Sequence, residues 1–261
     1  MSTTDPKTVA ALALALSLTG SAAADELFAV RADANELHRV DTQTGVSALV
    51  GPFTLGGTDL GVYSIATATD GSVFGISSSP FQGAVYSFDK QTGAATFAKK
   101  FPNPVTTAGA AIDPTDGTFW FLNTYGFVPW PQLNRIDLAT GDVDVPGLIG
   151  PNVSDLYAGI AFDAAGQLYV LNGTTNSLWR VDKNDPDGVN TTQVGVAFGG
   201  GIDFSQGGSL SFDPVSLQMV AYEFAKVRHL YAARLHIPDK TSASPRSKRL
   251  RTAGPSWSAV R

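Results

Sequence analysis

Short apolar runs alternate with turn-forming residues along most of the chain. In the segment LNRIDLATGD, Leu133, Arg135 and Asp137 alternate with Asn134, Ile136 and Leu138. This alternation is the two-residue period of a β-strand. Asp137 is then placed to bond the backbone of a turn, and Gly141 to adopt the positive φ at which the chain reverses. The segment is therefore predicted to be a strand that ends in a hairpin turn.

The same segment recurs along the chain. Related stretches are LHRVDTQTGV from Leu37, VYSFDKQTGA from Val85 and LWRVDKNDPDG from Leu178. Counted from their aspartates at positions 41, 89, 137 and 182, the spacings are 48, 48 and 45 residues. A fixed period of this size indicates a repeat architecture.

A second recurring element precedes each of these motifs except the first. It consists of an apolar run, a turn and another apolar run, as in SIATATDGSVFGI from Ser64, AAIDPTDGTFWFL from Ala110, GIAFDAAGQLYVLN from Gly159 and SLSFDPVSLQMVAYE from Ser209. The two elements together supply four short strands per period, which is typical of a β-propeller blade.

The pattern predicts an all-β propeller of about five four-stranded units with a period of 45 to 48 residues. The units span 27–50, 62–101, 108–150, 158–198 and 208–235. The first unit lacks its first strand and the fifth lacks its last, so we expect the ring to close incompletely.

These motifs resemble the NHL-like and YVTN-like propeller repeats of secreted bacterial proteins. The clearest matches are GIAFDAAGQLYVLN with LWRVD in the fourth unit and AAIDPTDGTFWFLN with LNRIDLATG in the third, and the resemblance covers roughly residues 27 to 235. It implies the propeller fold and says little about chemistry, because such repeats form a scaffold on which unrelated sites are built.

Composition supports an exported all-β protein. Only 16% of the 261 residues are charged, glycine is abundant (27), and the chain contains three glutamates, whereas surface helices are rich in glutamate and lysine. Lys7, an apolar run and the small residues before Asp25 predict a helical signal peptide over residues 1–24. We therefore expect a secreted or periplasmic cell-envelope protein, held together without disulfides because it has no cysteine.

The predicted domains are the signal peptide (1–24), the propeller (25–235) and a basic, disordered tail (236–261). Nine of the 18 basic residues lie between Lys226 and Arg261. The sequence pI of about 5.1 and the absence of a basic face on the repeats argue against nucleic-acid binding. No later segment is apolar enough to span a membrane, and a monomer is expected.

Candidate binding residues lie in the irregular connections, which gather on the face opposite the recurring turns. The insertion TYGFVPWPQ presents Tyr125, Phe127 and Trp130, which predict a stacking platform for a carbohydrate or a partner protein. Asn123 and Asn172 are candidate ligand-binding residues beside it. No cofactor is expected unless Asp59 and Asp155, the candidate metal ligands, bind calcium. The alternative roles are cover for the apolar edge of the disc and capping of turns.

No catalytic constellation is present in the sequence. The three histidines lack metal-ligand spacing, and there is no Gly-x-Ser-x-Gly elbow or Gly-rich phosphate loop. The leading interpretation is an exported, non-enzymatic binding module. The alternative is a metal-dependent propeller hydrolase that resembles the gluconolactonase and lactonase enzymes. A third interpretation, suggested by the incomplete last unit, is a portion of a longer propeller.

Overall fold

The fold was analysed in a computed structural model. It describes residues 17–18, 26–31, 34–41, 47–77, 83–101, 105, 107–124, 131–149, 155–185, 191–195, 208–213, 218–224, 230–235 and 248–249. These residues form strands and turns, and none of them lies in a helix that is long and apolar enough to cross a membrane.

The strands form antiparallel sheets in which chain order equals spatial order. The first sheet contains β1 (Ser17–Leu18), β2 (Glu26–Arg31), β3 (Glu36–Asp41) and β4 (Ser47–Pro52). The second contains β7 (Val62–Thr67), β8 (Val73–Ser77), β9 (Ala84–Phe88) and β10 (Ala95–Lys100). A two-stranded hairpin, β5 (Thr54–Leu55) and β6 (Thr58–Asp59), lies between them in the chain.

The remaining sheets repeat this plan. The third contains β11 (Thr107–Ile112), β12 (Phe119–Asn123), β13 (Gln132–Ile136) and β14 (Val143–Leu148). The fourth contains β15 (Tyr157–Phe162), β16 (Leu168–Asn172), β17 (Ser177–Val181) and β18 (Thr191–Gln193). The fifth contains β19 (Gly208–Asp213), β20 (Gln218–Phe224), β21 (Leu230–Leu235) and β22 (Lys248–Arg249).

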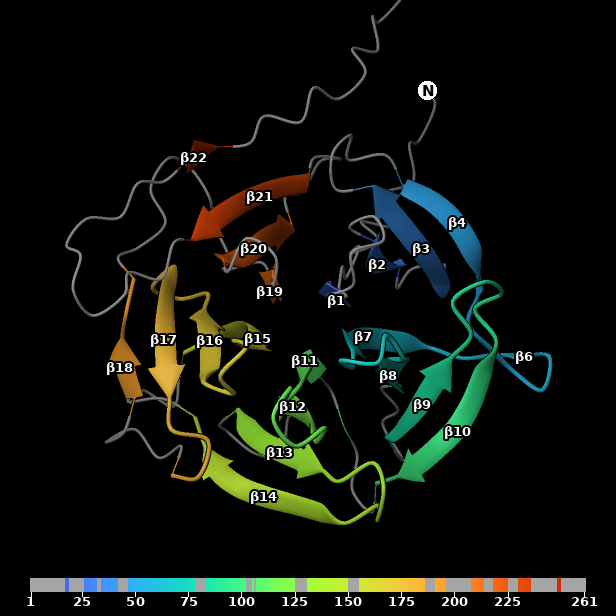
Figure 1. Cartoon of the computed structure of the whole chain (residues 1–261), viewed down its shortest axis with the longest axis horizontal. Coiled ribbons are helices and arrows are strands. Elements are labelled where there is room, and N and C mark those ends of the chain that lie inside the picture. The colour runs from blue at the N-terminus through green and yellow to red at the C-terminus, as the bar shows by residue number, and fades with distance from the viewer. Residues whose placement is uncertain are drawn as a thin grey trace, which may run out of the picture.

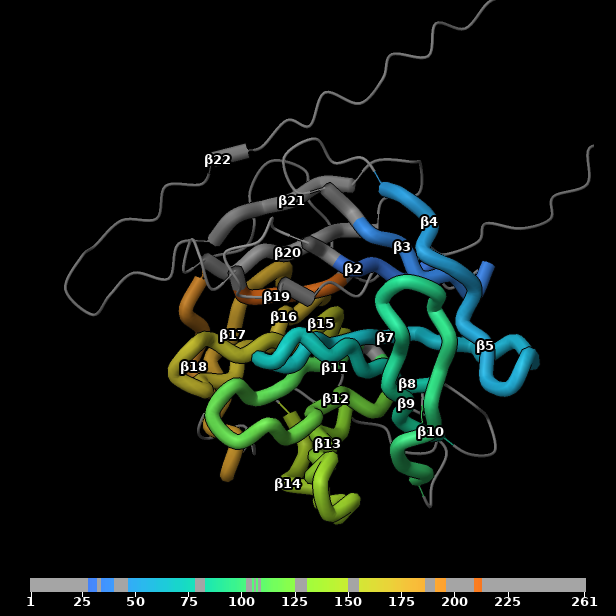
Figure 2. The backbone as a smooth tube through the Cα atoms, turned by 45° about the vertical axis from the view of Figure 1, so that its right-hand side comes forward, coloured from blue at the N-terminus to red at the C-terminus, as the bar shows by residue number. Residues whose placement is uncertain are grey.

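The sheets follow one another around a central axis (Figure 1). β7, β11, β15 and β19 lie nearest that axis, and β10, β14 and β18 lie on the rim. The view turned by 45° shows the second, third and fourth sheets following one another around the axis (Figure 2). The predicted all-β, propeller-like arrangement is therefore confirmed.

Each hydrophobic cluster of the core joins two neighbouring sheets. Phe28 and Leu37 of the first sheet pack with Ile65 of the second, and Trp120 of the third packs with Phe162 of the fourth. The second and third sheets share a further hydrophobic cluster, and the fourth and fifth sheets share another. Burial of a large apolar side chain contributes roughly 1.5–3 kcal/mol, so the junctions between sheets hold the fold together.

The recurring turns have the predicted geometry. In the β13–β14 turn, the Asp137 carboxylate accepts the backbone N–H groups of Ala139 (2.8 Å) and Thr140 (3.1 Å). Gly141 has a φ of 77°, and its N–H donates to the Asp137 carbonyl at 2.7 Å. The equivalent turn of the second sheet uses Asp89 in the same way.

Short strands occur at both ends of the predicted propeller. β1 lies within the predicted signal peptide, pairs with β2 and also contacts β19. β22 lies within the predicted tail and pairs with β21. Both supply a strand that the sequence pattern omitted, because a sheet edge offers unpaired N–H and C=O groups to any nearby segment. The remainder of the signal peptide and of the tail lies outside the described residues.

Candidate functional site

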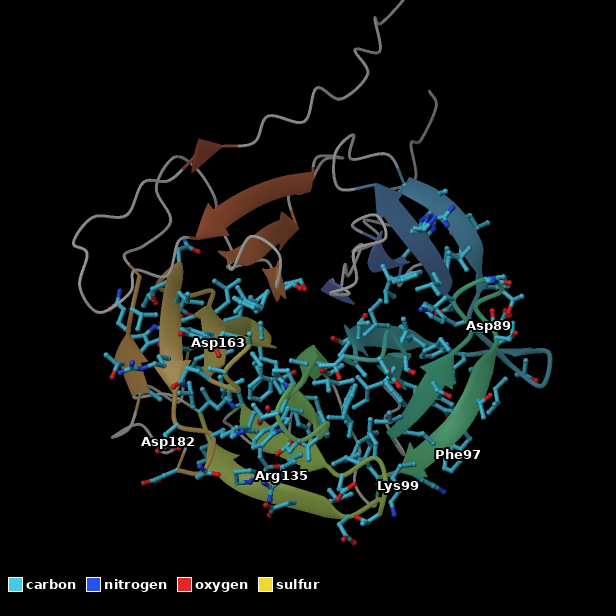
Figure 3. All side chains as sticks on the ribbon, in the orientation of Figure 1. Asp89, Phe97, Lys99, Arg135, Asp163 and Asp182 are labelled. Atoms are coloured by element: carbon cyan, nitrogen blue, oxygen red, sulfur yellow. The ribbon has the colours of Figure 1, made fainter. Side chains whose placement is uncertain are left out.

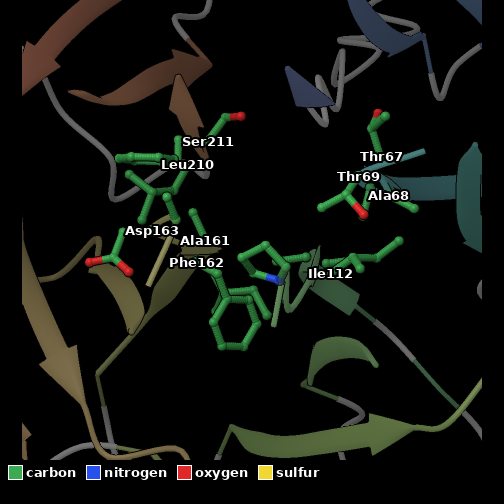
Figure 4. Close-up of a pocket in the computed structure, with 16 residues that line it drawn as sticks. Thr67, Ala68, Thr69, Ile112, Ala161, Phe162, Asp163, Leu210 and Ser211 are labelled. Carbon is green, nitrogen blue, oxygen red and sulfur yellow. The ribbon is translucent and has the colours of Figure 1, made fainter. Parts of the chain in front are cut away.

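A cavity of about 380 Å³ lies at the centre of the sheets, where the inner strands end (Figure 4). Its wall is formed by the ends of β7, β11, β15 and β19 and by the turns that follow the first three of them. The larger apolar residues of the lining are Ile112, Ile160, Phe162, Leu210 and Phe212. Most of the other lining residues are alanines, so the wall is predominantly apolar.

Small residues allow the inner strands to approach one another closely. A Cβ atom added to Gly109 would lie 2.9 Å from the Cα atom of Gly159, and one added to Gly159 would lie 2.7 Å from the backbone nitrogen of Leu210. A register shift precedes Gly109 in β11 and Gly159 in β15. Glycine is required at both positions because any side chain would collide with the backbone of the next sheet.

The inner strands also contribute backbone groups to the axis. β7, β11, β15 and β19 are each terminal in their sheets and pair on one side only. Their other edges face the axis (Figure 1), and the edge of a sheet carries backbone N–H and C=O groups with no neighbouring strand. Such edge groups bind water or a ligand, since a buried backbone group without a partner is costly.

The polar side chains of the cavity are Thr67, Thr69, Ser211 and Asp163. Asp163 is the only ionisable residue among them, and it also closes the turn after β15. Its Oδ1 atom accepts the N–H groups of Ala165 and Gln167, both at 2.9 Å, and its Oδ2 atom accepts the Tyr169 hydroxyl at 3.3 Å. The carboxylate therefore acts as a turn cap.

Tyr169 remains neutral at physiological pH. Burial raises the pKa of its hydroxyl to about 12, and the nearby Asp163 carboxylate adds to that shift. A phenol in this state donates a hydrogen bond and does not act as a base. The pair of Asp163 and Tyr169 is thus suited to fixing the shape of the cavity rim.

The residues predicted from the connecting loops lie elsewhere. Asn172 is fully buried; its side-chain nitrogen donates to Asp155 at 2.7 Å, and its side-chain oxygen accepts the Thr175 N–H at 3.0 Å. The structure therefore brings Asp155 and Asn172 together, as a tether between the start of β15 and the turn after β16. Asn123 is buried at the end of β12.

The two predicted metal ligands belong to different parts of the molecule. Asp59 is exposed in the β5–β6 hairpin at the rim of the disc (Figure 1), whereas Asp155 directly precedes the inner strand β15. Within the described ranges, no group of three or more His, Cys, Asp or Glu side chains is placed to hold a metal ion. Tyr125, Phe127 and Trp130, the predicted aromatic platform, lie outside the described residues.

Tyr157 is an additional polar group near Asp155. Its side chain is 2% exposed, and its hydroxyl has no hydrogen-bond partner among the described residues. Burial, together with the Asp155 charge, raises the pKa of this hydroxyl above its ordinary value. The hydroxyl stays protonated and contributes a buried donor beside the Asp155 tether.

Sequence reasoning did not single out the cavity residues. Thr67, Thr69 and Asp163 belong to the recurring hairpins, which the pattern assigned to scaffold alone. The available signal was the run of alanine and glycine in the inner strands, because small side chains near an axis leave room for a ligand.

Comparison with known proteins supports the fold. No protein-family model matches the chain, and no curated protein matches it in sequence. Several solved structures are similar at low sequence identity. A gluconolactonase from Xanthomonas campestris matches with a TM-score of 0.57 at 10% identity, over 85% of this chain and 72% of that one.

Two further structures show the same likeness. A chain of the nidogen/laminin complex matches with a TM-score of 0.55 at 13% identity, over 82% of this chain and 77% of that one. Virginiamycin B lyase from Staphylococcus aureus matches with a TM-score of 0.51 at 16% identity, over 92% and 71% of the two chains. At such identities the likeness establishes the fold and leaves the activity open. The chain is a β-propeller repeat protein, as the resemblance of its motifs to NHL-like and YVTN-like repeats implied.

Proposed function

We propose that this protein is an exported, monomeric propeller of five units that binds a small, largely apolar ligand in its central cavity without transforming it. The observation that carries the proposal is the lining of the cavity: apolar side chains, a few hydroxyl groups and the free edges of four inner strands. Cavities of a few hundred Å³ with this mixture of groups are typical of small-molecule sites.

The polar groups of the lining suit recognition better than chemistry. The one acid, Asp163, is bonded by two backbone N–H groups and by Tyr169, so it is poorly placed to take a proton from a ligand. Thr67, Thr69 and Ser211 supply hydroxyl groups that would orient a ligand. Export is proposed from the signal-like segment at residues 1–24, and a protein or carbohydrate partner at the aromatic insertion remains a separate proposal.

The proposal is tested with a hydrophobic fluorescent probe, 8-anilinonaphthalene-1-sulfonate. We expect saturable binding of one probe molecule to the full chain, and at least a tenfold loss of affinity in Ala161→Phe, which fills the cavity. Ala139→Phe, in the exposed β13–β14 turn, is the matched control. Circular dichroism verifies that each variant folds. Binding that is unchanged in Ala161→Phe contradicts the proposal.

The second candidate is the metal-dependent hydrolase. Asp163 is the observation in its favour, because it places one carboxylate at the cavity, and the similar structures include a gluconolactonase and a putative gluconolactonase. Hydrolysis of gluconolactone by the full chain, dependent on calcium and lost in Asp163→Asn, would support it. The absence of turnover with and without calcium, together with probe binding, would favour the binding module.

A further inference from the structure

A second cavity, of about 480 Å³, lies beside the β17–β18 turn of the fourth sheet. Its lining is mainly polar and includes Arg180, Lys183, Gln167, Asn184 and Thr192. It shares no lining residue with the central cavity, so it is independent of the function proposed above.

Arg180 is the unusual member of this lining. Its side chain is half-buried, and among the described residues it has no hydrogen-bond or ion-pair partner. A guanidinium carries five N–H donors, and leaving them unsatisfied in a partly buried place is unfavourable. The described side chains therefore leave the N–H groups of Arg180 to water or to a bound acceptor.

The repeat itself shows what normally satisfies this position. Arg135 occupies the equivalent place in the third sheet, opposite Trp120 on one side and Asp144 on the other. Its guanidinium donates to the Asp144 carboxylate at 2.7 Å and lies 5.4 Å from the centre of the Trp120 ring. Figure 3 shows Arg135 on the outer part of its sheet.

The fourth sheet replaces the acid by a hydroxyl. Arg180 lies opposite Tyr169 on one side and Thr192 on the other, so Thr192 stands where the third sheet has Asp144. The missing acceptor of Arg180 thus corresponds to a carboxylate that the neighbouring repeat provides from its own chain.

The other charged residues of the lining are Lys183 and Asp182. Lys183 is paired with the buried Asp113 of the third sheet. Asp182 is exposed, and its Oδ1 atom accepts the Asn184 N–H at 3.0 Å, as a turn cap does. Among the described residues that line the cavity, Arg180 is the cation without an ion-pair partner.

We propose that Arg180, with Asn184 and Thr192, forms a binding site for an anionic group, either a carboxylate or a phosphate. The planar fork of a guanidinium matches both groups through two parallel hydrogen bonds. Asn184 and Thr192 line the same cavity and add hydrogen-bonding groups around the anion. The bound anion takes the place that Asp144 has beside Arg135.

The test uses the full chain, titrated separately with inorganic phosphate and with acetate at constant ionic strength in chloride, and followed by NMR chemical shifts. We expect saturable binding of one or both anions by the wild-type protein. Arg180→Gln should weaken binding at least tenfold. Thr192→Asp, which supplies the internal carboxylate, should weaken it by the same factor while the protein stays folded.

Arg135→Gln is the matched control, because it changes the equivalent arginine of the paired repeat, and its binding should equal that of the wild type. The proposal is overturned if the wild type shows no saturable response, or if Thr192→Asp binds as the wild type does. An equal loss in Arg135→Gln and Arg180→Gln would also overturn it, since it would show a general effect of net charge. Binding of only one of the two anions would assign the site to that class.

Discussion

The junction between the second and third sheets and the junction between the third and fourth sheets solve the same packing problem with different residues. At the first junction, Ala68 and Leu138 both pack against one apolar cluster. At the second junction, the equivalent positions are Asp113 and Lys183, which form an ion pair. In both cases the two residues are 70 positions apart in the sequence. The backbone of the repeat therefore accepts either kind of contact at one place.

The polar junction is satisfied by more than the ion pair. Asp113 is fully buried, and its Oδ1 atom accepts both the backbone N–H (2.9 Å) and the hydroxyl (2.6 Å) of Thr115. The Lys183 ammonium lies 5.7 Å from the centre of the Phe162 ring. A buried pair offsets its desolvation only when further hydrogen bonds accompany it, and this one has them.

The largest effect is expected when the polar junction is broken on one side. Asp113→Ala leaves the Lys183 ammonium partly buried without its partner, and should lower the free energy of unfolding by about 3 kcal/mol. Urea unfolding measures the loss. The double variant Asp113→Ala/Lys183→Leu copies the apolar junction and should recover most of it. A double variant as unstable as the single one would show that the two junctions are not equivalent.

The inner strands provide the next test. Gly109 has no room for a Cβ atom where β11 approaches β15 of the next sheet, whereas Ser64 occupies the equivalent position in β7 of the preceding sheet. Gly109→Ala should lower the free energy of unfolding by about 2 kcal/mol because the added carbon forces the backbones apart. Ser64→Ala is the matched control and should change stability by less than about 0.5 kcal/mol. Equal effects of the two variants in thermal unfolding would contradict the close approach.

A smaller effect is expected from placing a charge in the apolar junction. Leu138→Lys should cost about 1–2 kcal/mol, because Leu138 is only half-buried and a lysine can extend its ammonium towards water. Adding Ala68→Asp supplies the partner found at the polar junction and should restore part of the loss. Chemical unfolding of the single and double variants gives the coupling energy. A coupling near zero would mean that Thr115 and Phe162 are indispensable to the natural pair.

The ion pair on the surface of the third sheet should matter least among the contacts. Arg135 and Asp144 are both well exposed, so Asp144→Thr should lower stability by under about 1 kcal/mol, and less in high salt. The same variant recreates the surroundings of Arg180 around Arg135. NMR titration with phosphate should then show a new response at Arg135.

The turns give a dependence on pH. Backbone hydrogen bonds, with Thr140 as the strongest, hold the pKa of Asp137 below its ordinary value of 3.8. A lowered pKa means that the carboxylate stabilises the fold above 3.8 and that this contribution is lost as the pH falls through the lowered value. Asp137→Asn should lower stability at neutral pH and flatten the acid dependence. Asp182→Asn, at a turn where the carboxylate accepts only the Asn184 N–H among the described backbone groups, should lower stability at neutral pH by less.

The sequence was sufficient for the sheets because their determinants are local. The alternation from Leu133 to Leu138 and the Asp137–Gly141 turn lie within ten residues, and the structure confirms both. Repetition at a fixed period then predicted a propeller. The two-residue strands β1 and β22 were omitted because they have no repeating motif and depend on a neighbouring sheet edge.

The sites are determined by distant contacts, and the sequence was correspondingly less informative about them. The central cavity is lined by four strands that are about 50 residues apart in the sequence. The binding groups that all four strands share are backbone groups at their edges, which do not depend on the type of side chain. Asp113 and Asp163 have the same place in their motifs, yet one binds Lys183 and the other lines the cavity. The pairing of Asp155 with Asn172 joins two candidates that the sequence could only name separately. Calcium binding by Asp59 or Asp155 stays a prediction.

The buried pair of Asp113 and Lys183 also influences which repeat unit can stably follow which. Units of similar sequence can be duplicated or exchanged by recombination, and apolar junctions accept many neighbours. A unit that carries Lys183 is most stable after a unit that carries an acid at the position of Asp113, because beside Ala68 the lysine would have no carboxylate partner. One charged contact between two units thus favours a particular order of these units in the ring.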